Sequence, residues 1–388
     1  MSVINLLILL LLVVGHTELV TTFINRIHGL PLPERFLKQL RHLHDVWVPL
    51  FPVLLFWLVG VRGARLLFGG SWFQLSGFWR AYLLLCAVGT VGFVVHLLRF
   101  RLERKPELLL SNHSQTVDMI KRLGRRPLGE GPFLFLTKVP GNEIFQLEVS
   151  EKQFRLPRLP RQWDQLSILH LSDLHFIGTI DRPFFEELVE LGKELNCDLA
   201  VLTGDLLDCQ RLVEWLPTTL GRLSCPLGCY FVLGNHDWNL EPEEIRKWLE
   251  ELGWRNVAGR RVVLQQEGKP PLVVAGTERP WMGRHPELND VPSEAFRLLL
   301  SHTPDNLSWA RRHQVDLMLC GHNHGGQVRL PMIGPVYSPS LHGCVYSGGA
   351  YWKPPTLLYV SRGVSGRHPL RLGCKPELTK LVLRSHEQ

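Results

Sequence analysis

The sequence lacks the cysteine pattern of a disulfide-stabilised or zinc-ribbon protein. Its eight cysteines are scattered over 388 residues, without the dense, regular spacing of a disulfide scaffold and without paired CxxC segments. Internal repeats and low-complexity tracts are also absent from the sequence. These absences exclude a small disulfide-rich fold and favour reduced thiols in a cytosolic compartment.

A long basic stripe with interleaved aromatic residues, which is typical of nucleic-acid binding, is missing as well. The formal net charge is nevertheless +7, and the basic residues cluster beside apolar runs. Basic clusters next to apolar segments are typical of membrane proteins. The charge therefore indicates a membrane surface, and no nucleic-acid partner is expected.

Apolar residues of the first hundred positions fall into three runs, none of which is a long, uninterrupted span. The runs are Val3 to Val14 with a weaker continuation to Ile24, Val46 to Val61, and Ala81 to Leu98. A helix needs about 20 apolar residues to cross the bilayer core, so the third run fits best. The first run could instead be a signal peptide, but it has no basic n-region and no small-residue cleavage site. We therefore expect a membrane anchor of about three transmembrane helices in residues 1–105, with buried core helices as the alternative.

Basic residues also predict the orientation of these helices. Four Lys and Arg residues lie within residues 26–41, after the first run, and four lie within residues 99–105, after the third. The positive-inside tendency places both segments in the cytoplasm, although Arg62, Arg65 and Arg80 in the opposite loop weaken the contrast. The expected protein is thus multi-pass, with an outside N-terminus and a cytoplasmic C-terminal domain.

The rest of the chain reads as a linker followed by an α/β domain. Residues 106–164 contain turn signals and one alternating stretch, Phe145, Leu147 and Val149, which predicts a leading strand in an edge hairpin. From residue 165 to 388, short β-rich runs alternate with helical patterns, as in an α/β domain. The predicted strands are Leu166–Leu171, Leu199–Thr203, Tyr230–Leu233, Val262–Leu264, Leu272–Ala275, Leu298–Leu300 and Leu317–Leu319.

Polar residues crowd the C-terminal ends of five of these strands, where open α/β sheets place their ligands. The five segments are Asp173-Leu174-His175, Gly204-Asp205-Leu206-Leu207-Asp208, Gly234-Asn235-His236-Asp237, Ser301-His302 and Gly321-His322-Asn323-His324. A lone histidine at a strand end is usually structural, and Asp208 is equally well interpreted as the cap of the next helix. So many histidine, aspartate and asparagine side chains at such ends are improbable by chance. Oxygen and nitrogen ligands in this mixture suit zinc, manganese or iron.

In this order, the motifs D-x-H, G-D-x-x-D, G-N-H-D, a lone H and G-H-x-H resemble those of the calcineurin-like metallophosphoesterase superfamily. The resemblance extends from about Gln165 to the C-terminus, and the segment from Gly325 to Pro331 is similar to the membrane-linked bacterial branch. It implies an α/β fold, a four-layer αββα sandwich with the ligands on loops at one edge, preceded here by the transmembrane helices.

The resemblance also implies a binuclear metal centre. Carried over motif by motif, Asp173, His175, Asp205 and His324 would hold one divalent ion, and Asp205, Asn235, His302 and His322 the other. A water shared by two such ions about 3.5 to 4 Å apart loses a proton near neutral pH and becomes a hydroxide nucleophile. His236, positioned by Asp237, would stabilise the transition state and protonate the leaving oxygen, and Asp208 is a candidate partner for a ligand.

The expected function is therefore membrane-associated hydrolysis of a phosphoester with two divalent metal ions, Mn, Zn or Fe. An apolar and basic segment at Arg279–His285 precedes His302 and suggests a lipid-linked headgroup, with an ordinary surface loop as the alternative. The leading specific substrate is a UDP-linked diacylglucosamine, which enzymes of the resembling branch hydrolyse at the membrane. The alternatives are a general phosphodiesterase or phosphatase acting on soluble phosphoesters, and a metal-stabilised membrane scaffold without turnover. In a scaffold, His236 would serve no purpose.

Overall fold

A computed structural model describes residues 1–103 and 106–386, which fall into two compact units. The first unit, called here the helical unit, comprises Met1–Arg104 and Met332–Val345. The second, called the catalytic unit, comprises Lys105–Pro331 and Tyr346–Gln388. The chain therefore passes from one unit to the other more than once.

Within residues 1–103, three helices are long and apolar enough to cross a membrane. They are α1 (Val3–His28), α2 (Glu34–Leu54) continued by a π-helical segment (Leu55–Arg62), and α3 (Gly77–Leu102). A 26-residue helix such as α1 is about 39 Å long and exceeds the roughly 30 Å of a hydrocarbon core. The expectation of three N-terminal helices apolar enough to span a membrane is confirmed.

Small residues allow α1 and α3 to approach closely. A Cβ atom at Gly15 would lie 1.7 Å from the carbonyl oxygen of Cys86, and one at Gly89 would lie 2.2 Å from that of Gly15. Contacts of this kind between small residues drive the packing of membrane helices, because lipid offers no hydrophobic gain on association.

The segment Met332–Val345 belongs to the helical unit although it lies far along the chain. The buried Asn25 side chain donates to the Val336 carbonyl at 3.0 Å and accepts from the Ser338 amide at 3.1 Å. The Arg41 guanidinium lies over the Tyr337 ring, 5.0 Å from its centroid. The sequence pattern did not predict this association.

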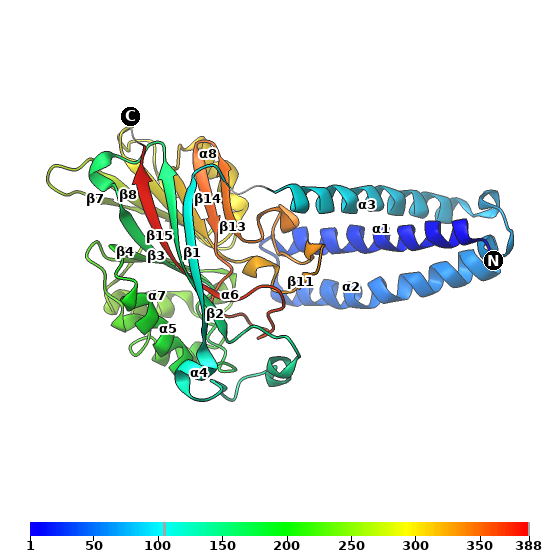
Figure 1. The fold of residues 1–388 in the computed structure, drawn as a ribbon, viewed down its shortest axis with the longest axis horizontal. Coiled ribbons are helices and arrows are strands. Elements are labelled where there is room, and N and C mark those ends of the chain that lie inside the picture. The colour runs from blue at the N-terminus through cyan, green and yellow to red at the C-terminus, as the bar shows by residue number, and fades with distance from the viewer. Residues whose placement is uncertain (104–105, 387–388) are drawn as a thin grey trace. The chain divides into compact units, whose positions relative to one another are not determined.

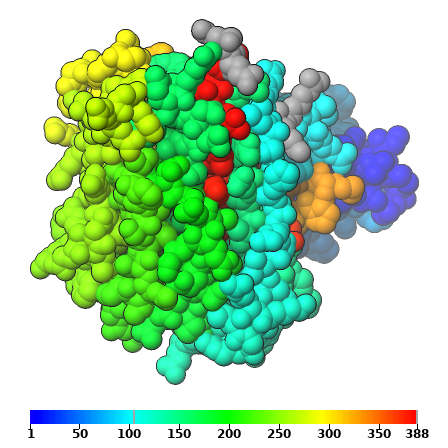
Figure 2. Space-filling model, turned by 60° about the vertical axis from the view of Figure 1, so that its left-hand side comes forward, coloured from blue at the N-terminus to red at the C-terminus, as the bar shows by residue number. Residues whose placement is uncertain are grey.

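The catalytic unit contains two mixed β-sheets (Figure 1). Within residues 106–386, the larger sheet has seven strands in the order β1-β2-β15-β3-β4-β5-β6. Their bounds are Leu109–Asp118, Gln146–Leu156, Glu377–Ser385, Leu166–Leu171, Leu199–Thr203, Cys229–Val232 and Trp254–Asn256. The strands β3 to β6 are parallel, and the β1–β2 hairpin forms one edge. In Figure 2, red residues of the C-terminal segment reach the surface between cyan and green residues, in agreement with the pairing of β15 between β2 and β3.

The smaller sheet of the same residues has six strands in the order β13-β14-β10-β9-β8-β7. Their bounds are Gly349–Lys353, Thr356–Val360, Leu317–Cys320, Phe296–Ser301, Leu272–Thr277 and Arg261–Leu264. The four inner strands are parallel, and both edge strands are antiparallel to their neighbours. Two further two-residue strands are β11 (Arg329–Leu330) and β12 (Gly334–Pro335).

Successive side chains of a strand point to opposite faces of its sheet, so apolar residues form three hydrophobic cores, one between the sheets and one on each outer face. Ile168 and Val201 of the larger sheet pack with Leu298 and Leu319 of the smaller one in the core between the sheets. The outer face of the larger sheet is covered by α5 (Arg182–Glu194) and α7 (Pro242–Glu251), and that of the smaller one by α8 (Leu307–Arg312). Two short helices, α4 (Met119–Leu123) and α6 (Asn235–Trp238), lie in connections. The layers run helix, sheet, sheet, helix, and the predicted αββα class is confirmed.

Candidate metal centre

The polar segments predicted at the strand ends meet at one edge of the sandwich. The loops that carry them follow β3, β4 and β5 of the larger sheet and β9 and β10 of the smaller one. The carboxyl ends of parallel strands share one edge, which is why residues far apart in sequence come together. The residues concerned are Asp173, His175, Asp205, Asn235, His236, Asp237, His302, His322 and His324, all of them buried or half-buried.

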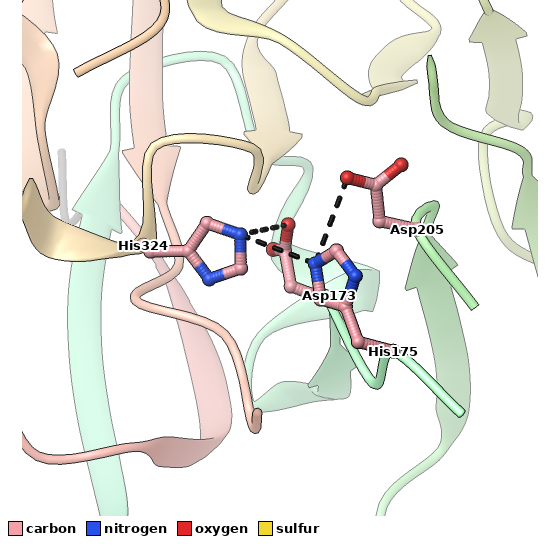
Figure 3. A group of neighbouring side chains, drawn as sticks. All are labelled: Asp173, His175, Asp205 and His324. Carbon is pink, nitrogen blue, oxygen red and sulfur yellow. Dashed lines mark hydrogen bonds and ion pairs between the residues drawn. The ribbon is translucent and has the colours of Figure 1, made fainter. Parts of the chain in front are cut away.

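One group of possible ligands consists of Asp173, His175, Asp205 and His324, whose donor atoms lie within 4.8 Å of one another (Figure 3). The Nε2 atoms of His175 and His324 are 3.2 Å apart. The Asp173 Oδ1 lies 3.5 Å from the Nε2 of His324, and the Asp205 Oδ2 lies 3.7 Å from that of His175. Two carboxylates and two imidazoles thus point at a common centre.

A second group, Asp205, His302 and His322, shares Asp205 with the first. The Nε2 of His302 lies 3.2 Å from the Asp205 Oδ2 and 3.1 Å from the His322 Nδ1. The amide oxygen of Asn235 lies 3.1 Å from the same Nε2 atom. Asp205 is therefore placed to bridge two adjacent ligand groups.

Hydrogen bonds to the far side of two rings show that this donor set fits a cation. The Nδ1 atoms of His175 and His302 face acceptors, the Asp208 carboxylate at 2.7 Å and the Thr203 carbonyl at 2.7 Å, so each carries a proton. In a neutral ring, the Nε2 lone pair then points at the centre, the arrangement that metal-binding histidines adopt. A lone pair of His302 facing the oxygens of Asp205 and Asn235 is repulsive unless a cation or a proton lies between them.

Burial and neighbouring histidines determine the pKa values of the two candidate ligand carboxyl groups. Burial raises the pKa of Asp173, since the carboxylate loses water. Burial also opposes ionisation of Asp205, but the facing His302 and His236 outweigh it and lower the pKa of Asp205 well below its usual range. Asp205 is thus held as an anion at the point where the two groups meet.

The backbone of the centre is strained. Asp173, His175, Asp205, His322 and His324 have φ values of 54°, 49°, 52°, 70° and 48°, in the left-handed region that residues other than glycine rarely adopt. Each such residue costs about 1–3 kcal/mol, and such strain concentrates at functional sites. The surrounding fold therefore stabilises a strained backbone conformation that positions these side chains at the centre.

The loop after β10 is held by close packing and by a buried arginine. A Cβ atom at Gly321 would lie 2.1 Å from the Asp173 Oδ2, so only glycine lets this loop pass the carboxylate. The amide of His322 donates to both carboxylate oxygens of Asp173, at 3.0 and 3.2 Å. Arg371, which is fully buried, donates to the carbonyl oxygen of His324 at 2.9 Å.

His236 lies beside the ligand groups without belonging to either. Its Nδ1 contacts the Asp208 Oδ1 at 2.5 Å, and its Nε2 lies 3.9 Å from the Asp205 Oδ2. Burial lowers the pKa of His236, but Asp208 and Asp205 outweigh burial and raise this pKa to about 10. The ring is therefore protonated near neutral pH, and part of its surface is open to solvent, with the side chain 23% exposed.

The expectation that Asp237 positions His236 needs correction. The Asp237 carboxylate accepts hydrogen bonds from the amides of Leu206, Leu207 and Gly234 and thereby joins the loops after β4 and β5. Asp208 holds the His236 ring instead, and it also holds His175. Asp208, expected as a partner for a ligand, thus contacts His175, a candidate ligand. The G-D-x-x-D motif marked Asp208 in the sequence. Its contact with His236 could not be read from the sequence, because the two residues are 28 positions apart.

Trp281 is a site residue whose place the sequence did not reveal. Its indole packs against the rings of His302 and His322, with centroids 5.6 and 5.0 Å away. The side chain is buried, and the nearby His285 ring stacks on Trp309 at 4.5 Å. In the segment Arg279–His285, which was expected to receive a lipid headgroup, Trp281 faces two candidate ligand histidines, while Arg279 and Arg284 are exposed.

The fold and the site together define an αββα sandwich protein with residues that could hold two metal ions. Residues 166–326 match the family described as calcineurin-like phosphoesterase. The Bacillus subtilis protein named uncharacterized metallophosphoesterase YkuE is 30% identical over 256 residues, covering 63% of this chain and 87% of that protein. Escherichia coli phosphodiesterase YaeI is 31% identical over 221 residues, covering 56% and 81%. UDP-2,3-diacylglucosamine pyrophosphatase LpxG of Chlamydia muridarum is 25% identical over 292 residues, covering 60% and 88%.

These matches show that the chain belongs to the calcineurin-like metallophosphoesterase family and is a hydrolase. The predicted resemblance is confirmed.

Proposed function

We propose that this protein is a multi-pass membrane phosphoester hydrolase that uses two divalent metal ions, Mn, Zn or Fe, at the centre described above. One ion would be held by Asp173, His175, Asp205 and His324, and the other by Asp205, Asn235, His302 and His322. The observation that carries the proposal is the convergence of two candidate ligand groups on Asp205, with the His236 ring beside them.

Cations bound in both groups would polarise the phosphoryl oxygens and lower the pKa of a water molecule toward neutrality. The chain itself supplies position and a proton. Asp205 and Asn235 present oxygen atoms toward the shared space, and Trp281 keeps the rings of His302 and His322 in place. His236, charged and held by Asp208, is suited to bind a phosphoryl oxygen and to give its Nε2 proton to the leaving oxygen.

Two findings support a lipid-linked substrate, such as a UDP-linked diacylglucosamine. Three helices of the chain are long and apolar enough to span a membrane. The relative LpxG carries the name of a UDP-2,3-diacylglucosamine pyrophosphatase. Basic residues after α1 and α3 favour a cytoplasmic catalytic unit, in keeping with a nucleotide-linked substrate.

The test is hydrolysis of bis-p-nitrophenyl phosphate and of a UDP-linked diacyl sugar by detergent-purified full-length protein with added manganese. Asp205→Ala and His236→Ala are compared with His113→Ala, which removes an exposed histidine of β1. We expect both site variants to lose at least 100-fold in kcat and the control to stay within twofold. Bound metal should fall in Asp205→Ala and persist in His236→Ala.

Turnover that is indifferent to added metal, or equal in all variants, would contradict the proposed mechanism. Turnover of bis-p-nitrophenyl phosphate without turnover of the lipid would support the proposed hydrolase activity but would indicate that the substrates are soluble phosphoesters.

A further inference from the structure

Four successive apolar residues, Phe133, Leu134, Phe135 and Leu136, lie at the surface of the catalytic unit and are called here the apolar lip. Phe135 is 66% exposed and the other three are half-buried. A run of surface apolar residues of this length is unfavourable in water unless it serves a contact. Phe133 also adopts the left-handed φ of 62°, which is a rare conformation for a bulky residue.

The lip is a fixed feature of the fold. The Thr137 hydroxyl donates to the Leu134 carbonyl at 2.7 Å within the short 3₁₀ helix Leu134–Lys138. The Asn142 amide donates to the carbonyls of Leu136 at 2.9 Å and Pro369 at 2.8 Å. These bonds hold the apolar side chains at the surface, so their exposure is not that of a loose loop.

Contacts connect the lip to the loop that carries a metal ligand. The Phe133 ring lies 4.6 Å from the His368 ring, and the Gln327 side chain donates to the His368 carbonyl at 2.5 Å. Gln327 itself follows His324 by three residues, and its backbone amide donates to the His324 carbonyl at 3.0 Å. Only two residues, His368 and Gln327, thus stand between the lip and a residue of the metal centre.

Cationic side chains lie close to the lip. Lys138 is exposed at its end, and Arg367 precedes the His368 ring on which Phe133 packs. Apolar side chains beside cationic ones match a molecule that joins hydrocarbon to an anionic phosphate group.

The chain between α3 and β1 is short. α3 ends at Leu102 and β1 begins at Leu109, so the six residues between them reach about 20 Å at most. If α3 spans a bilayer, the catalytic unit cannot move far from the membrane. Of the segment expected to meet lipid, Trp281 is buried against the His322 ring, while Arg279 and Arg284 are exposed.

We propose that the apolar lip binds the acyl chains of a lipid-linked phosphoester in the adjoining leaflet, so that its phosphate enters the metal centre. This assignment rests on the proposed hydrolase function and names the substrate feature that the site selects. Phe135 is then a specificity-determining residue, since it favours substrates with hydrocarbon chains over soluble phosphoesters.

Photo-crosslinking tests the contact without relying on turnover. The full-length protein, with p-benzoylphenylalanine in place of Phe135, is reconstituted in phosphatidylcholine vesicles that contain tritiated lipid, and it is irradiated. The matched control carries the same group at Val263, which is 43% exposed on the edge strand β7. We expect lipid label on the protein substituted at position 135 to exceed that at position 263 at least fivefold. Equal label at both positions, or none at 135, would overturn the proposal.

Kinetics test the specificity. Phe135→Ser should lower kcat/KM for a UDP-linked diacyl sugar at least tenfold and leave kcat/KM for bis-p-nitrophenyl phosphate within twofold, while Val263→Ser changes neither. An equal loss on both substrates would mean a structural role and overturn the proposal, as would an unchanged rate on the lipid. Should the wild type turn over neither substrate, the hydrolase function fails, and the crosslinking result alone decides whether the lip binds lipid.

Discussion

At the scale of residues, Asp208 connects two parts of the site that have different tasks. One carboxylate oxygen accepts a hydrogen bond from the Nδ1 of His175, a candidate metal ligand, and the other contacts the Nδ1 of His236. The pKa of Asp208 is far below its usual range because His236 and His175 outweigh the effect of burial. A single anion thus fixes the direction of a ligand and keeps a proton on the neighbouring ring.

Replacement of Asp208 by asparagine should therefore impair both tasks. An amide carries no charge to hold the His236 proton, and it can accept from only one of the two rings through its single oxygen. Loss of a hydrogen-bond partner of a ligand typically costs about 10–100-fold in metal affinity or activity. We expect Asp208→Asn to lower kcat by at least tenfold and to weaken metal binding, measured by steady-state kinetics and by metal titration.

The matched control is Asp290→Asn, because Asp290 pairs with Arg261 at the surface, away from the ligand groups. A full rate in Asp208→Asn, or an equal loss in both variants, would show that the carboxylate does not serve the two rings.

At this scale, the sequence predicted which residues meet but not how they pair. The meeting of the candidate ligands could be predicted because each follows a β-rich run, and strand ends gather at one edge of a sheet. The partner of His236 could not, since Asp237 is adjacent in sequence while Asp208 arrives from the preceding loop. The contact of Trp281 with the histidine rings could not be predicted either, because an indole in a loop has the same pattern whether it faces solvent or packs on histidine rings.

At the scale of secondary-structure elements, a buried charged group joins the last strand to the sheets. Glu377 begins β15 and accepts from the Arg362 side chain at 2.8 Å and from the Tyr359 hydroxyl at 2.9 Å, where Tyr359 belongs to β14 of the other sheet. Burial favours the neutral acid, but Arg362 and Lys152 outweigh it and lower the pKa of Glu377 to about 2. The anion therefore stabilises the fold.

This lowered pKa predicts a stability that depends on pH. A carboxyl whose pKa falls from 4.5 to about 2 on folding contributes stability above about pH 4.5, and this contribution is lost as pH falls toward 2. The shift corresponds to roughly 3 kcal/mol. We expect Glu377→Gln to be destabilised by about that amount at pH 7 and the difference from wild type to narrow below pH 4.5, measured by denaturant unfolding of metal-free protein.

Glu294→Gln, which changes an exposed glutamate, is the control and should follow the wild type at every pH. A difference between Glu377→Gln and the wild type that stays constant from pH 7 to pH 3 would contradict the role of the ionised carboxyl.

Elements defined by local pattern were predicted closely, and those defined by distant pairing were not. The expected strands at residues 166–171 and 199–203 coincide with β3 and β4, because each is an apolar run closed by a polar motif. β15 lies between β2 and β3, although about 200 residues separate it from both in sequence. Its hydrogen-bonding partners depend on the tertiary fold, which no local periodicity encodes.

At the scale of the whole molecule, metal binding and folding should be coupled. The centre gathers buried carboxylates and imidazoles from five loops, and it holds strained backbone at several of them. A ligand that binds only the folded state adds about 2.7 kcal/mol of stability at a concentration of 100 times its Kd. We expect removal of metal with a chelator to lower the Tm of the catalytic unit by several degrees and added manganese to restore it, measured by calorimetry.

The Asp205→Ala variant provides the control, because it lacks the residue shared by both ligand groups. Its Tm should barely respond to chelator or manganese. A response equal to that of the wild type would show that the stabilising metal binds elsewhere.

The membership of Met332–Val345 in the helical unit has a practical consequence for anyone who trims this protein to obtain a water-soluble enzyme. A fragment that starts at β1 would retain this segment and lose Asn25, which satisfies the Val336 carbonyl and the Ser338 amide. Tyr337 would lose Arg41 as well. The segment would then be an unsupported loop open to proteases, only a few residues from His324, so poor activity of such a fragment would reflect the cut and not the chemistry.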